Sequence, residues 1–130
     1  PERYSYHMIE ESGVFVINLT TEALTYATDY CGVRSGKDVD KFKEMGLTAI
    51  PASVVKAPMI GESPVNIECK VREVKPLGSH DMFLADVVAV HADEKFPSTS
   101  DRSYGSGCPA RRYLLFMQTK IIWMKMAGLI

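Results

Sequence analysis

The chain has 130 residues, with 15 basic and 16 acidic side chains and a net charge of −1. This length fits one domain, and the near-neutral balance points away from nucleic acid and anionic membranes as partners. No apolar run approaches the roughly 18 residues that a membrane span needs. The three cysteines lie far apart and are odd in number, which argues against a disulfide framework or a zinc site and favours a reduced, cytoplasmic setting.

The first part of the chain predicts two short helices on either side of a buried strand. Residues 1–12 are expected to form a turn that leads into a short helix with Ser5 as its N-cap, and Gly13 is a suitable stop. Residues 14–19 are an apolar run that is typical of a buried strand. A second helix is expected over residues 20–30.

A stretch rich in small residues, DYCGVRSGKDVDKF, follows at residues 29–42. Residues 31–37 are expected to form a loop that runs into a helix beginning near Asp38. Exposed backbone N–H groups and the positive end of a helix dipole favour an anion such as phosphate, to which Lys41 adds a charge and Ser35 a hydroxyl donor. The alternative is that the glycines only supply turn dihedrals and that the charges are solvated.

The second part of the chain predicts a β-hairpin. Residues 47–64 contain three prolines and are expected to form an extended connection with short strand pieces. Residues 65–74 alternate between apolar residues and polar ones, Glu68 among them, as in a half-buried antiparallel strand. Residues 75–80 form the turn to a second strand at 81–91. Strands interrupted by short helices indicate a mainly β fold with accessory helices.

Three further positions are candidate ligand-binding residues. Arg3 is a phosphate-type donor beside Ser5, although a plain N-cap with an exposed arginine explains the same residues. His80 lies in the predicted hairpin turn and matters only if that turn reaches a ligand. Cys31 has no nearby cysteine or fixed base, so we interpret it as a packing residue.

Several motifs in order along the chain resemble the flavin reductase-like, FMN-binding split-barrel family, close to flavoredoxins. They are PERYSYHMI, SGVFVINL, DYCGxxSGxxxDKF, GLT, VKAPMI, ECKV and GSHDMFLADVVAVHADE. The resemblance covers residues 1 to about 95. It implies a mainly β fold, an incomplete Greek-key split barrel with short accessory helices.

The resemblance also implies a function. The protein would bind FMN non-covalently near a homodimer interface and transfer electrons through the flavin, with NAD(P)H or a redox partner protein as the donor. The family implies an NAD(P)H-dependent flavin oxidoreductase, while a non-catalytic flavin-binding or dimerisation module and an inactive truncated product remain as alternatives. It implies no metal and leaves the catalytic residues open. The matching cofactor-binding positions are Arg3, Ser5, Cys31, Gly32, Ser35, Lys41 and His80.

Residues 96–130 depart from the resemblance. They carry 5 basic side chains and one acidic side chain, whereas residues 1–95 carry 10 basic and 15 acidic ones. The codons of residues 116–127 permit a shifted frame that spells His-Ala-Asp-Glu and then Asp-Glu-x-Gly, like the family's continuation. We therefore expect a partial split-barrel domain at residues 1–95, without the family's first strands, and a non-homologous, frameshifted tail at 96–130. A divergent C-terminal helix with a basic face is the alternative.

Overall fold

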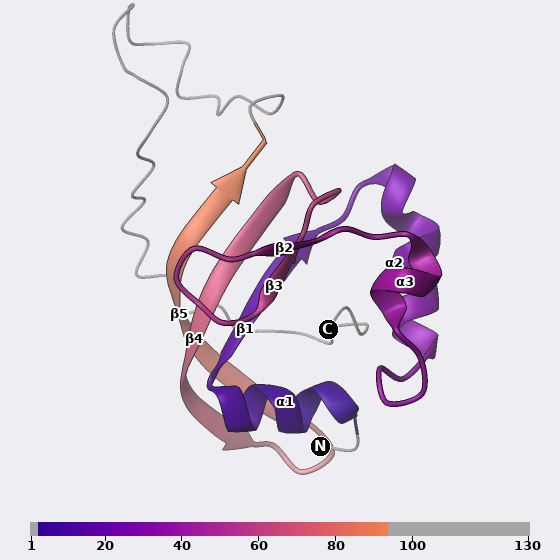
Figure 1. The fold of residues 1–130 in the computed structure, drawn as a ribbon. Coiled ribbons are helices and arrows are strands. Elements are labelled where there is room, and N and C mark those ends of the chain that lie inside the picture. Colours follow the sequence, from indigo (N-terminus) through magenta and orange to yellow (C-terminus); the bar gives the residue numbers. More distant parts are fainter. Residues whose placement is uncertain (1–2, 94–130) are drawn as a thin grey trace, which may run out of the picture.

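The computed structural model describes residues 3–93, in which helices border a three-stranded sheet (Figure 1). The helices are α1 (Tyr4–Ser12), the 3-10 helix η1 (Glu22–Leu24), α2 (Thr25–Val33) and α3 (Lys41–Met45). The strands are β1 (Val14–Leu19), β2 (Ala49–Pro51), β3 (Pro58–Ile60), β4 (Val65–Pro76) and β5 (Asp81–Ala92). The predicted mainly β architecture with short accessory helices is confirmed for these residues.

The main sheet has the strand order β1-β4-β5, and both pairings are antiparallel. The central strand β4 pairs with β1 along residues 65–70 and with β5 over most of its length. In the turn between β4 and β5, the backbone N–H of Leu77 donates to the carbonyl oxygen of His80 at 2.8 Å, and Gly78 has a φ of 87°. The predicted strands and hairpin are therefore confirmed.

Each face of the main sheet carries its own apolar cluster. On one face Phe15 and Cys69 are buried, and Ile9 of α1 packs against them. Because consecutive strand residues point to opposite faces, Val16 lies on the other face, where it meets Met59 of β3. Figure 1 shows the segment of β2 and β3 crossing in front of the sheet, and α1 lying across the end of the strands.

Two helices start at positions other than those predicted. Arg3 rather than Ser5 occupies the N-cap position of α1, and its side chain makes no capping hydrogen bond. α3 begins at Lys41 because the side chain of Asp40 accepts a hydrogen bond from the backbone N–H of Lys43 at 3.2 Å. A carboxylate of the chain itself therefore occupies the helix start where the sequence predicted an anion.

The end of α2 also differs from the prediction. The helix runs to Val33, so Cys31 and Gly32 are helical, and Ser35 is the one predicted site residue of this stretch that lies in the loop that follows. The predicted tail at residues 96–130 lies outside the described residues.

Gly13 ends α1 in the left-handed region, at a φ of 67°, where its N–H donates to the carbonyl oxygen of Ile9 at 2.9 Å. A Cβ here would meet nothing within 4 Å, so a substitution costs only backbone strain. We expect Gly13→Ala to lower the free energy of unfolding by about 1 kcal/mol, and Gly13→Asn by less, in urea denaturation. Equal stability of Gly13→Ala and the parent chain would contradict this account of the helix end.

Candidate functional site

Two cationic side chains meet at the C-terminal end of α2. Arg3, at the start of α1, donates from Nη1 to the carbonyl oxygen of Gly32 at 3.1 Å. Lys41, at the start of α3, donates from Nζ to the carbonyl oxygen of Cys31 at 2.9 Å. The last carbonyls of a helix carry partial negative charge, so they favour cations. The structure thus brings together four of the seven predicted site residues.

Lys41 combines burial with a positive neighbour. It has 8% of its surface exposed. Burial lowers the pKa of its ammonium group, the nearby Cys31 opposes this effect, and Arg3 lowers the pKa further. An anionic ligand beside Arg3 and Lys41 would offset this repulsion, so the pair suits a phosphate or carboxylate.

The other three predicted site residues lie on separate elements of the fold. Ser5 is half-buried in the first turn of α1. Ser35 follows α2, and its Oγ accepts a hydrogen bond from the backbone N–H of Lys37 at 3.2 Å. His80 is exposed in the turn between β4 and β5, where its Nδ1 lies 2.9 Å from the Oγ of Ser79. His80 is therefore bonded to its neighbour in the turn rather than to the Arg3–Lys41 pair.

Helix α1 lies between the Arg3–Lys41 pair and the turn that carries His80. The ring of Tyr6 packs edge-on against Phe83 of β5, with 5.4 Å between the ring centroids. The carboxylate of Asp81, at the start of β5, raises the pKa of the Tyr6 hydroxyl. Figure 1 shows the turn between β4 and β5 beside the first residues of α1. The fold therefore carries the turn with His80 to the end of the molecule where α1 begins.

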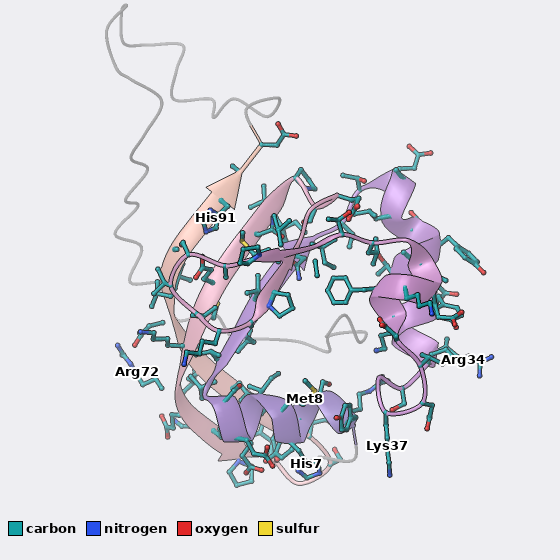
Figure 2. All side chains as sticks on the ribbon, viewed as in Figure 1. His7, Met8, Arg34, Lys37, Arg72 and His91 are labelled. Atoms are coloured by element: carbon teal, nitrogen blue, oxygen red, sulfur yellow. The ribbon has the colours of Figure 1, made fainter. Side chains whose placement is uncertain are left out.

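A cavity of about 250 Å³ lies between α1, β1, α3 and residues 56–60. Most of its lining side chains are apolar, and two lysines, Lys41 and Lys56, also line it. The aromatic ring of Phe42, on α3, is also among the lining residues. Figure 2 shows Met8 on the side of α1 that faces this space and His7 on the opposite side. Such a lining suits a flat apolar body that carries an acidic group.

A buried carboxylate on β4 was not predicted from the sequence. Glu68 was predicted to face the polar side of the strand, but it is fully buried and accepts from the backbone N–H groups of Ser53, Val54 and Val55 at 2.7–2.9 Å. The Oγ of Ser53 donates to it at 2.6 Å, and the Nε2 of His91 lies 2.6 Å from its Oε1. Burial alone would raise the pKa of Glu68, but these hydrogen bonds lower it to about 2.

The grouping of Ser53, His91 and Glu68 is not a nucleophile–base–acid relay. Both the Ser53 Oγ, at 3.2 Å, and the Glu68 Oε1, at 2.6 Å, meet the same ring nitrogen of His91. A relay needs one partner on each ring nitrogen. The backbone N–H groups of Val54 and Val55 point to Glu68 and so do not form an oxyanion hole. The geometry indicates an anchor for this loop.

Thiol chemistry does not fit the described cysteines. Burial raises the pKa of the Cys31 thiol, an effect that Lys41 partly opposes, and burial raises the pKa of Cys69 to about 11. Cys31 therefore contributes its carbonyl oxygen to the site, while its side chain packs inside the fold, as the sequence suggested.

Residues 3–93 contain neither a cluster of metal-ligating side chains nor a membrane-spanning helix. No group of three or more His, Cys, Asp or Glu side chains in this range is arranged to hold a metal ion. The helices of the same range include none that is long and apolar enough to cross a membrane.

Solved structures of two flavoredoxins are similar to this chain. Flavoredoxin of Desulfovibrio vulgaris (Miyazaki F) is 36% identical, with a TM-score of 0.68 over 72% of this chain and 50% of that chain. Flavoredoxin from Methanosarcina acetivorans is 30% identical, with a TM-score of 0.67 over 74% of this chain and 50% of that chain. A protein from Shewanella frigidimarina with a split barrel domain, 23% identical, matches in fold with a TM-score of 0.67 over 75% of this chain and 50% of that chain. The predicted split-barrel fold is confirmed.

The sequence itself matches a family model described as flavin reductase like domain, over residues 1–121. An uncharacterized protein of Pyrococcus abyssi is 33% identical over 97 residues, which are 74% of this chain and 55% of that protein. One of Aeropyrum pernix is 35% identical over 97 residues, 74% of this chain and 37% of that protein. The chain belongs to the flavin reductase-like domain family, and it spans about half the length of these relatives or less.

The carboxylate of Glu68 makes the stability of the fold depend on pH. Because its pKa in the folded state is about 2 and lies below that of the unfolded chain, its contribution is complete above about pH 5 and is lost as the pH falls toward 2. We expect Glu68→Gln to lower the free energy of unfolding by about 3 kcal/mol at pH 7 and by progressively less toward pH 3. Chemical denaturation at several pH values measures this difference.

Glu73→Gln is the matched control, because Glu73 lies on the same strand but is half-exposed and pairs with Lys75 at 3.5 Å. We expect it to change the free energy of unfolding by less than about 0.5 kcal/mol. A difference between Glu68→Gln and the parent chain that stays constant from pH 7 to pH 3 would refute the role given to the carboxylate.

Proposed function

We propose that this chain is the FMN-binding part of a flavin reductase-like protein that transfers electrons through its flavin. The observation that carries this proposal is the meeting of Arg3 and Lys41 at the end of α2, with Lys41 also lining a mostly apolar cavity. An apolar wall suits the isoalloxazine ring, and the two cations suit the anionic groups of the cofactor. Membership of the flavin reductase-like domain family supports the same ligand.

The described residues fit FMN through side chains rather than through a helix start. Asp40 already caps α3, so we assign the anion-binding role to the side chains of Arg3 and Lys41. Ser5 and His80 would supply hydrogen bonds from the first turn of α1 and from the hairpin turn beside it. When bound, the flavin supplies the redox chemistry, and the protein supplies its position and electrostatic environment.

We also propose an electron donor, an oligomeric state and a cellular location for this protein. The electron donor would be NAD(P)H or a redox partner protein, and the working unit a homodimer in the cytoplasm. Tyr26 and Val33 on α2 have 73% and 78% of their surface exposed, which supports burial of this face against a second subunit. The free thiols of Cys31 and Cys69 support a reducing compartment.

A pair of lysines on α3 tests the proposal. Lys41→Ala removes the buried ammonium group, and we expect it to raise the dissociation constant for FMN by roughly tenfold or more, as loss of a charge-assisted hydrogen bond predicts. Lys43→Ala, on the same helix but exposed, should change it by less than about twofold. Titration of FMN, followed by quenching of flavin fluorescence, measures both constants.

Lys41→Met, which keeps most of the side-chain volume, should weaken FMN binding as much as Lys41→Ala does, because the lost group is the charge. If the parent chain does not bind FMN, or if the Lys41 and Lys43 variants lose affinity equally, the proposed function is wrong.

A further inference from the structure

The loop that connects β2 to β3 is tied to the sheet at one point. Ser53, Val54 and Val55 make five hydrogen bonds to the sheet in the described structure, and all five end on Glu68 or His91. Figure 2 shows His91 on β5, beside the segment that connects β2 to β3. One fully buried carboxylate therefore accepts hydrogen bonds from the backbone N–H groups of Ser53, Val54 and Val55 and from the Ser53 hydroxyl.

Other contacts constrain this loop much less. Pro51 pairs with Pro58 at the end of the ladder between β2 and β3, and neither proline nitrogen can donate a hydrogen bond. Val55 packs in the cluster with Val16 and Met59, but apolar contacts are not directional. The position and direction of the loop therefore depend on the hydrogen bonds to Glu68.

The residues directly after Val55 form one wall of the cavity. Lys56, Ala57 and Pro58 line it, together with Lys41 from α3. A change in the path of the loop would move the stem and charge of Lys56 and alter the shape of this wall. The contacts of Glu68 are thus transmitted along the chain to a cavity whose lining residues do not include Glu68 itself.

We propose that Glu68 is a positioning residue of the cofactor site, which holds Lys56 and the adjoining wall in place through the loop Ser53–Val55. This inference rests on the proposed function of the cavity. Glutamine at position 68 has almost the same size and keeps one acceptor oxygen, but its NH2 group donates at the place where the second carboxylate oxygen accepts. The amide would therefore release part of the loop without removing side-chain volume.

The test compares Glu68→Gln with Glu73→Gln, the same change at a half-exposed site of β4, and with Cys69→Ala, a core change beside Glu68 that faces the other cluster. Three quantities are measured on the full chain. They are the hydrogen-exchange rates of the amides of residues 53–55, the rate of acetylation of Lys56 relative to Lys70, and the affinity for FMN. In Glu68→Gln we expect tenfold faster exchange of these amides, at least threefold changed labelling of Lys56, and at least fivefold weaker FMN binding. Both controls should change each quantity by less than twofold.

Ser53→Ala, which removes one donor and leaves the carboxylate, should shift the same three quantities in the same direction by smaller factors, and it keeps the test valid if Glu68→Gln does not fold. Unchanged exchange and labelling in the folded Glu68→Gln and Ser53→Ala variants would overturn the proposal. An FMN affinity that falls no further in Glu68→Gln than in Cys69→Ala would overturn it as well. Absence of FMN binding by the parent chain contradicts the proposed function instead, and exchange and labelling then decide the role of Glu68.

Discussion

A single buried carboxylate joins the two layers of this domain. Glu68 lies on β4, the central strand, and receives donors from the loop over one face of the sheet and from His91 on β5. A buried charge is costly unless it is paired and hydrogen-bonded, and here five donors surround it. The segment of β2 and β3 therefore stands at a fixed place over the sheet, and the cavity between this segment, β1, α1 and α3 has a defined wall.

A second polar contact organises the helices. Arg3 and Lys41 bind consecutive carbonyl oxygens at the end of α2, so they join the starts of α1 and α3 to the end of α2. The same two side chains provide the positive charge that an anionic cofactor needs. Burial and a second cation lower the pKa of this buried lysine. Such a perturbed pKa is typical of a functional site, where an anionic ligand would stabilise the charged form of the lysine. If the proposed function is correct, the atoms that join these helices also bind the cofactor.

The fold was largely predictable, because strand alternation and turn residues are local signals. β1 and the hairpin of β4 and β5 follow from them, as does the stop at Gly13. The end of α2 was not predictable: Cys31 and Gly32 were read as loop residues, but they stay helical where their carbonyls bind cations from distant segments. The burial of Glu68 was not predictable either. The alternation of polar and apolar residues in β4 does not show that a loop covers the polar side of the strand. For the site, the motif around Lys41 indicated the position of the lysine, whereas its burial and its contact with Cys31 depend on tertiary structure.

The central claim is that Lys41 belongs to the site that binds the flavin. The most direct measurement is a carbon–proton correlation spectrum of the chain with labelled lysine side chains, recorded while FMN is added to saturation. We expect the ε-methylene signal of Lys41 to shift more than that of any other lysine in residues 3–93. A Lys41 signal that stays in place while flavin fluorescence shows saturated binding would contradict the account.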